Sequence, residues 1–338
     1  MPGQPLRTGL LERIDELARI DAALAEACAG RGRFVVLEGP AGIGKTAVLA
    51  AVRDSASVRG MRVLRARGTE LEREFAFGVV RQLFEPPLAQ ASELERGELL
   101  HATAGTAAGI LDLPGAAAPD DPASLRLDVS FAVLHGLYWL CANLSAAGPV
   151  CLVVDDAHWA DAPSLRYLTF LLTRLEELDV ALVLATRPQE VGTETELLAT
   201  LAGDSCADLI RLAPLSRAGV AQLVEATLDG VPDPLFVDNC LRETGGSPFL
   251  LRVLVDALRE GGVAPTADAA RYVERIGARP VGRSVRLKLR RLPEHAGRLA
   301  QALAILEESE LLQAARLADL DEAEAAAQAA STSRSTTQ

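Results

Sequence analysis

Two patterns of apolar and polar positions alternate between residues 34 and 212. Short runs of strand length, most of them continuously apolar, occur at 34–37, 62–66, 150–154, 180–185 and 209–212. Runs that are apolar on both faces are typical of parallel strands covered by helices. Stretches with apolar residues three and four positions apart lie between several of them and favour helices. The alternation predicts an α/β fold with a five-stranded parallel sheet.

The same patterns set the expected element boundaries. We expect helices at 10–29, from about residue 44, at 70–88 and at 161–177. Pro86 and Pro87 should end the third of these helices, because proline lacks the N–H that continues a helix. The apolar stretch Val129–Leu144 is too short and too polar to span a membrane, and it predicts a core helix. Residues 112–124 are polar and proline-rich, which indicates a loop.

From Ser216 onward only the helical pattern remains. Helices are expected at 218–228, 234–243, 248–260, 284–292, 293–307 and 311–330. Residues 331–338 are polar and give no reason for order. A helical region is therefore expected to follow the α/β part.

The turn after the first strand carries the strongest chemical signal. It reads GPAGIGKT and fits the pattern G-x-x-x-x-G-K-[ST], with the required strand before it and helix after it. Glycines let successive backbone N–H groups point at phosphate oxygens, and the helix N-terminus adds a favourable dipole. Lys45 would reach the β- and γ-phosphates, and the Thr46 hydroxyl would bind Mg²⁺. The predicted nucleotide-binding residues are Gly39, Pro40, Ala41, Gly42, Ile43, Gly44, Lys45 and Thr46.

Composition favours this interpretation over an ordinary glycine-rich turn. The chain contains only two lysines, Lys45 and Lys288, and its other basic residues are all arginines. A chance match to the pattern is therefore rare, roughly one in a thousand for a chain of this composition. We expect the chain to bind a nucleoside triphosphate together with Mg²⁺.

Charged residues at the ends of later strands complete the predicted site. Asp155 and Asp156 directly follow the apolar run VCLVV. One carboxylate there can hold Mg²⁺, and a second can orient or deprotonate the attacking water. We assign Asp155 to the metal and Asp156 to the water, although the two roles could be shared. Arg187 ends the next strand, where an arginine can stabilise the charge of the transferring phosphate. The predicted catalytic residues are thus Asp156, Lys45 and Arg187, with Thr46 and Asp155 on the metal.

Other features narrow the class of protein. The net charge of −12 and the pI of about 5.0 do not indicate a basic surface that would bind nucleic acid. The stretch Arg279–Arg298 is nevertheless locally basic. The five cysteines lack C-x-x-C spacing, which suits reduced, buried thiols. His158 has no Cys or His neighbour and is expected to pack or to support the site rather than bind metal. With no signal peptide visible, we expect a soluble, cytoplasmic protein.

Several segments together resemble the ATPase module of the large ATP-binding regulators of the LuxR family, a branch of the STAND signal-transducing NTPases. The resemblance covers roughly residues 8 to 328 and rests on LLERIDELARIDAAL, EGPAGIGKT, LEREFAFGVVRQLFEP, VVDDAHWADAPSLRYL, LVLATRP, LIRLAPLS and TGGSPFLLRVL. It implies the strand order 5-1-4-3-2, which sets the strands of Asp155 and Arg187 beside the strand of the phosphate loop.

The resemblance also implies residue roles and a working cycle. Arg187 matches the family's sensor arginine, and Pro248 matches a proline that packs on adenine. Arg13 matches the arginine of an N-terminal G-R-E motif, although Glu12 and Ile14 flank it here. In such a switch, ADP holds the module closed, ATP opens it for self-association, and hydrolysis resets it.

By the same resemblance, the chain should contain an N-terminal helical segment (1–30), a P-loop NTPase domain (31–215), a helical lid domain (216–275), an incomplete winged-helix domain (276–330) and a disordered tail (331–338). The family's wing strands, its histidine for the ADP β-phosphate, its sensor repeats and its DNA-binding helix-turn-helix have no counterpart here. We therefore expect either a truncated or separately made piece of a regulator, or a stand-alone module.

The leading interpretation is an ATP-binding, weakly ATP-hydrolysing switch of a transcription regulator that self-associates when ATP is bound and contacts a regulator partner. The alternative is a non-catalytic nucleotide-binding module that docks onto a partner protein, which the incomplete winged-helix domain favours. A metabolic kinase is a third interpretation, but the sequence contains no recognisable acceptor-site motif. Direct binding of DNA or of a membrane is not expected.

Overall fold

The computed structural model describes residues 10–70, 73, 75–111, 131–188, 193–204 and 206–274. The chain divides into two compact units. The first holds the described residues up to Gly39 and from Gly44 to Leu212, and the second holds Pro40–Ile43 and the described residues from Ala213 onward. The loop predicted at 112–124 and the helices predicted from residue 284 onward lie outside the described residues.

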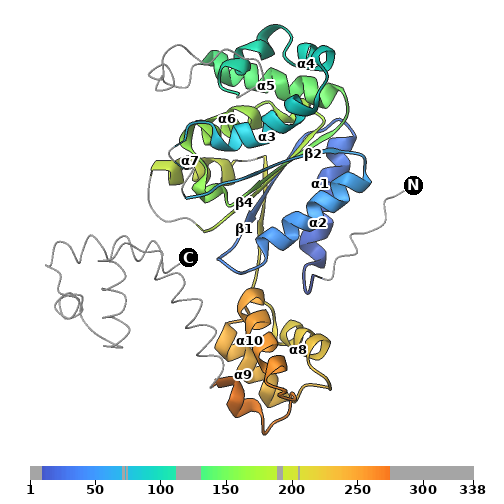
Figure 1. Cartoon of the computed structure of the whole chain (residues 1–338), viewed down its shortest axis with the longest axis vertical. Coiled ribbons are helices and arrows are strands. Elements are labelled where there is room, and N and C mark those ends of the chain that lie inside the picture. Colours follow the sequence, from blue (N-terminus) through green and yellow to red (C-terminus); the bar gives the residue numbers. More distant parts are fainter. Residues whose placement is uncertain are drawn as a thin grey trace, which may run out of the picture. The chain divides into compact units, whose positions relative to one another are not determined.

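The first unit is built on a five-stranded parallel sheet (Figure 1). Its strands are β1 (Arg33–Glu38), β2 (Arg62–Arg67), β3 (Val150–Asp155), β4 (Val180–Thr186) and β5 (Ala207–Arg211). They lie in the order β2-β3-β4-β1-β5, which confirms the predicted sheet and strand order. β4 is the direct neighbour of β1, and β3 lies one strand further. Every residue of β3 and β4 is buried, as expected for central parallel strands.

Helices cover both faces of this sheet (Figure 1). The helical elements of the unit are α1 (Ile14–Cys28), α2 (Lys45–Val58), α3 (Gly78–Gln90), α4 (Glu93–Leu99), η1 (Ala102–Gly109), α5 (Phe131–Ala146), η3 (Ala157–Trp159), α6 (Ala162–Leu172), η4 (Leu175–Glu177) and α7 (Thr193–Ala202). α1 and α2 lie on one face, and α3 and α6 lie on the other (Figure 1). The larger core, between the sheet and α3, α5 and α6, includes the fully buried Phe34, Phe84 and Tyr167.

The prediction for the third helix is wrong at both ends. α3 begins at Gly78 rather than near residue 70, because Phe77 has a left-handed backbone (φ 63°) that a helix cannot pass through. It also continues past Pro86 and Pro87 to Gln90. The two prolines lie in its last two turns, and the Arg96 guanidinium donates to the carbonyl of Leu88, beyond them, at 3.0 Å. A helix end can be satisfied in this way by side chains from outside it.

Other boundaries also differ from expectation. α1 begins at Ile14, and α6 ends at Leu172, after which η4 forms a separate turn. α4, η1 and α7 are helical elements that the patterns did not predict. α4 has a complete capping box, in which Ser92 and Glu95 satisfy each other's backbone N–H groups, and this signal is readable in the sequence as S-x-x-E.

One buried carboxylate fixes the start of two helices in the first unit. Asp161, the N-cap residue of α6, accepts from the backbone N–H of Ser164 at 2.8 Å. It also accepts from the backbone N–H groups of Phe77 at 2.7 Å and Val79 at 3.3 Å, at the start of α3. Asp161 is only 3% exposed, so water cannot replace these bonds.

We therefore expect Asp161→Ala to destabilise the first unit by about 3 kcal/mol, because three buried N–H groups lose their acceptor. Urea unfolding followed by tryptophan fluorescence reports this unit specifically, since both tryptophans, Trp139 and Trp159, belong to it. Asp161→Asn should cost less, because its amide oxygen still accepts. Equal, small losses for both variants would contradict the assigned role.

The second unit contains three helices among its described residues. They are α8 (Arg217–Thr227), α9 (Pro234–Thr244) and α10 (Pro248–Glu260), each within one residue of the predicted bounds. Ser216 and Asp233 cap α8 and α9, and proline opens both α9 and α10, as the sequence signals suggested. Phe236, Val255 and Leu258 are among the side chains that form its core.

The cysteines are free thiols, as predicted, but not all of them are buried. Cys141, Cys151 and Cys240 are buried, and burial raises the pKa of each thiol to about 12. Cys28 and Cys206 are exposed, because Cys28 ends α1 on its outer side and Cys206 lies in the turn before β5. In the part of the chain that the structure describes, no helix has the length and apolar character needed to cross a bilayer.

Candidate functional site

The candidate site lies at the carboxyl edge of the sheet, where β1, β3 and β4 end. The phosphate loop follows β1, and α2 begins at Lys45 directly behind it. Gly42 (φ 79°) and Gly44 (φ 105°) both adopt left-handed conformations, which glycine takes without strain. Gly44 is the second glycine of the pattern, and Gly42 stands at one of its variable positions. The Gly39 N–H donates to the carbonyl of Thr186 at 3.2 Å, which ties the start of the loop to the end of β4.

Lys45 is the cation of the loop. Its Nζ donates to the carbonyl of Gly39 at 2.6 Å, and the residue is only 6% exposed. Burial, together with the charge of Arg187, lowers the pKa of Lys45 to about 8, although Asp156 and Asp155 partly oppose this. The ammonium group is thus held inside the loop, beside the position that a phosphate would take.

Thr46 and Asp155 meet at the opening of α2. The Thr46 hydroxyl donates to Oδ2 of Asp155 at 2.9 Å, and Oδ1 of the same carboxylate accepts from the backbone N–H of Asp156 at 2.9 Å. Oxygen ligands of this kind suit Mg²⁺, which usually takes one or two protein carboxylates and completes its shell with phosphate oxygens and water. The described residues contain no cluster of three His, Cys, Asp or Glu residues that could hold a metal.

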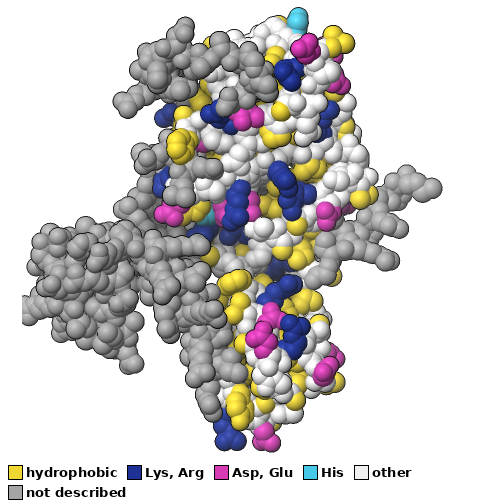
Figure 2. Space-filling view, in the orientation of Figure 1, with side chains coloured by type: hydrophobic (Ala, Val, Ile, Leu, Met, Phe, Trp, Pro, Cys, Tyr) yellow, Lys and Arg dark blue, Asp and Glu magenta, His cyan; other side chains and the backbone are white. Residues whose placement is uncertain are grey.

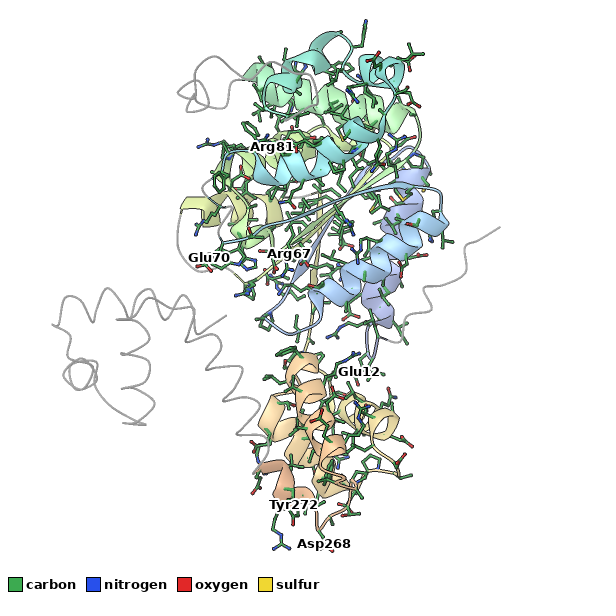
Figure 3. All side chains as sticks on the ribbon, in the orientation of Figure 1. Glu12, Arg67, Glu70, Arg81, Asp268 and Tyr272 are labelled. Carbon is green, nitrogen blue, oxygen red and sulfur yellow. The ribbon has the colours of Figure 1, made fainter. Side chains whose placement is uncertain are left out.

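Asp156 occupies a strained position and already has a partner. Its backbone is left-handed (φ 49°), which is uncommon outside glycine. Oδ2 of Asp156 accepts from Nη2 of Arg67 at 2.8 Å and from Nε at 3.1 Å. Arg67 is the last residue of β2 and reaches over the same edge of the sheet (Figure 3).

Arg67 was not among the residues predicted from the sequence. The available signal was its position, because a residue that ends β2 lies at the same sheet edge as residues that end β3. Gly68 is part of the same arrangement, since a Cβ there would lie 2.5 Å from the Asp156 carbonyl oxygen. The close approach of the two strand ends therefore requires glycine.

Arg187 and His158 bring unpaired polar atoms to this edge. Nε and Nη1 of Arg187 and both ring nitrogens of His158 are buried and have no hydrogen-bond partner among the described residues. Burial and the charge of Arg187 lower the pKa of His158 to about 3, despite the opposing effect of Asp156, so the imidazole is neutral. Burial also lowers the pKa of Arg187, against the charges of Asp156 and Glu70.

The two residues inferred from the resemblance lie on other elements. Arg13 is the N-cap residue of α1 and is 4% exposed. Its guanidinium donates a hydrogen bond to the carbonyl of Glu12 at 2.9 Å. Pro248 is the first residue of α10 in the second unit. In that unit the next residue, Phe249, donates its N–H to the carbonyl of Gly42 at 3.1 Å. The nucleotide contacts of Arg13 and Pro248 stay predictions.

The residues present fit a nucleoside triphosphate and its cation. The loop has the left-handed glycines and the lysine that a phosphate needs, and Thr46 and Asp155 present oxygen atoms to a cation. The unpaired nitrogens of Arg187 supply the kind of donors that a phosphate oxygen accepts from. A bound nucleotide would bring the base and ribose for recognition and the phosphoanhydride bond for hydrolysis.

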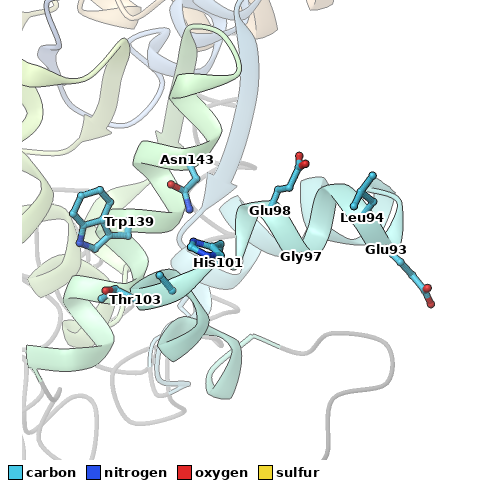
Figure 4. A pocket seen from close by; sticks show the side chains of 9 residues that line it. Glu93, Leu94, Gly97, Glu98, His101, Thr103, Trp139 and Asn143 are labelled. Carbon is cyan, nitrogen blue, oxygen red and sulfur yellow. The ribbon is translucent and has the colours of Figure 1, made fainter.

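Away from this edge, the structure shows a cavity and a mixed surface. The cavity, of about 630 Å³, is lined by nine residues of α4, η1, α5 and the link before η1, among them Glu98, His101, Trp139 and Asn143 (Figure 4). On the face seen in Figure 2, basic and acidic side chains of the described residues are interspersed. The basic stretch Arg279–Arg298 lies outside the described residues.

Comparison with protein families gives one assignment. A model of the AAA ATPase domain matches residues 9–184, just over half of the chain. The matched span contains the phosphate loop, Asp155 and Asp156, and it ends shortly before Arg187. An uncharacterised protein of Rhizobium meliloti (strain 1021) is 26% identical in an alignment 201 residues long, which covers 53% of this chain and 18% of that protein. The chain thus spans less than a fifth of the length of this curated relative.

Two solved structures are similar to this chain at low sequence identity. The Aeropyrum pernix ORC1 protein, in its complex with DNA, superposes with a TM-score of 0.52 and 20% identity, over 92% of this chain and 77% of that chain. A STAND protein with a tetratricopeptide repeat sensor from Pyrococcus horikoshii gives a TM-score of 0.41 and 15% identity, over 89% of this chain and 35% of that chain. The first likeness supports the fold alone.

Proposed function

The chain belongs to the AAA ATPase domain family, and from this premise we propose that it is an ATP-binding, slowly hydrolysing switch module of a LuxR-family transcription regulator. One observation carries the nucleotide part of the proposal. Lys45, the Thr46–Asp155 pair and Arg187 come together at the end of three neighbouring strands, as phosphate and Mg²⁺ binding require. The regulator part rests on the segments that resemble the LuxR-family ATPase module.

In this proposal each residue has a defined role. Lys45 and the loop N–H groups bind the β- and γ-phosphates, and Thr46 and Asp155 hold Mg²⁺. Asp156 orients or deprotonates the attacking water, and Arg187 stabilises the charge on the transferring phosphoryl group. ADP and ATP then select different states, and the ATP state self-associates in the cytoplasm, where a regulator partner completes the output.

The Arg67–Asp156 ion pair supports slow hydrolysis. Oδ2 of Asp156 already accepts two hydrogen bonds from the Arg67 guanidinium, so an attacking water must compete with Arg67 for this carboxylate. The same pair also fits the alternative function, a nucleotide-binding interaction module that does not hydrolyse ATP. Rates measured on an Asp156 variant distinguish the two functions.

We expect Arg67→Gln to raise the basal ATPase rate about two- to fivefold, since an exposed ion pair is worth at most about 1 kcal/mol. The Arg67 side chain is 64% exposed, so its loss should leave the fold intact. Arg65→Gln is the matched control, because Arg65 is exposed on the same strand. A rate lowered by Arg67→Gln but not by Arg65→Gln would show that Arg67 assists the reaction instead.

The proposal is tested by the nucleotide content and mass of the purified chain. Bound nucleotide is extracted and identified, and light scattering is then measured with ADP and with ATP and Mg²⁺. Co-purified ADP, and a larger particle only with ATP and Mg²⁺, is the expected result. A chain that contains no nucleotide and keeps its mass with either nucleotide would contradict the switch.

A further inference from the structure

His158 is a polar residue at this edge to which the proposed function gives no role. It lies in η3, two residues after Asp156, and its ring contacts that of Trp159 with centroids 5.2 Å apart. Neither Nδ1 nor Nε2 has a hydrogen-bond partner among the residues described, and both atoms are buried. A side chain that served only to pack would more often be apolar or have its polar atoms satisfied.

Arg187 shares this property at the same edge. Its Nε and Nη1 are also buried and lack partners within the described part of the chain. β3 leads into His158 and β4 ends just before Arg187, and these strands are direct neighbours. Four buried nitrogens without partners thus gather where two adjacent strands end. A ligand that accepts hydrogen bonds would satisfy most of them.

The charge state of the imidazole narrows the chemistry of that ligand. Arg187 already supplies a positive charge, and the pKa of His158 is lowered to about 3, so the ring contributes hydrogen bonds without further charge. A neutral imidazole has one N–H donor and one acceptor nitrogen. A terminal phosphoryl group with a nearby water offers the complementary pair, because its oxygens accept and the water donates.

We infer that His158 is a hydrogen-bonding residue of the terminal-phosphate subsite, where its neutral ring donates to a γ-phosphoryl oxygen beside Arg187. This inference rests on the proposed ATP-binding function. Because ADP lacks the γ-phosphoryl group, the contact distinguishes the two nucleotides, and His158 is a specificity residue for ATP over ADP. A residue that only packs in η3 would affect both nucleotides equally.

The test compares affinities for ADP and for a non-hydrolysable ATP analogue, both with Mg²⁺, by calorimetry on the full chain. His158→Phe keeps a ring of similar size but removes both nitrogens. We expect it to weaken the ATP analogue about 10- to 100-fold, the loss typical of one hydrogen bond to a charged group, and ADP less than twofold. His135→Phe is the matched control, since His135 lies in α5 and bonds Trp139.

A second variant keeps the test decisive if His158→Phe folds poorly. His158→Asn retains an N–H donor and should recover part of the preference for the ATP analogue. Equal weakening of both nucleotides by both variants, or no change with either, would overturn the inference. Failure of the unmodified chain to bind any nucleotide is a separate outcome, which would overturn the proposed function as well.

Discussion

Lys45→Met should weaken ATP binding about 100-fold, because the loop loses its only charged donor to the β- and γ-phosphates. The Lys45 ammonium group is held within the loop, where its Nζ donates to the Gly39 carbonyl at 2.6 Å. Isothermal calorimetry with ATP and Mg²⁺ measures the effect directly. ADP binding should weaken as well, since Lys45 is placed to contact the β-phosphate of either nucleotide.

The melting temperature of the Lys45→Met variant shows whether weaker ATP binding comes from the lost contact or from loss of the fold. Burial lowers the pKa of Lys45 to about 8, so the folded protein holds the ammonium less favourably than water does. Methionine at this position should therefore leave the melting temperature unchanged or raise it. Arg53→Met, which removes a cation further along α2, is the matched control and should bind ATP normally. Normal ATP affinity of the Lys45 variant would contradict the site.

Asp156→Asn should lower the ATPase rate by about 10²- to 10⁴-fold and leave the affinity for ATP within a few-fold of the unmodified chain. The reason is that an amide cannot take a proton from the attacking water, while phosphate and cation contacts lie elsewhere. Single-turnover hydrolysis of radiolabelled ATP measures the rate even when turnover is slow.

Asp155→Asn provides the contrast for this experiment. It removes the carboxylate that accepts from Thr46, so the dependence of ATP binding on Mg²⁺ should weaken in this variant and not in Asp156→Asn. If Asp156→Asn hydrolysed ATP at the rate of the unmodified chain, the non-catalytic interaction module would be the better description.

The fold could be predicted from the sequence where the signal was local. Short runs of strand length, most of them continuously apolar, predicted the strands of the sheet, and the loop pattern predicted the start of α2. α3 was misjudged because its start depends on Asp161, a residue more than 80 positions away in the chain that accepts from the N–H of Phe77. No periodicity within residues 70–88 contains that information.

The residues of the candidate site could likewise be predicted where the sequence signal was local, and were missed where their role depends on distant parts of the chain. The phosphate loop, Asp155 and Arg187 could be found because each follows an apolar run, and parallel strands bring such ends to one edge. Arg67 was missed because its partnership with Asp156 arises from the pairing of β2 with β3. The unpaired state of His158 likewise depends on which groups surround it in three dimensions.

The bond between Lys45 and the Gly39 carbonyl has a consequence for nucleotide exchange. An incoming phosphate competes with an internal partner, so the contribution of Lys45 to the free energy of binding is the difference between two bonds to the same ammonium group. That difference is smaller than the strength of the phosphate contact alone. When the nucleotide leaves, the loop recovers its own bond at once, which lowers the cost of release. Such a loop favours reversible occupancy, in which the bound nucleotide follows the ratio of ATP to ADP around it.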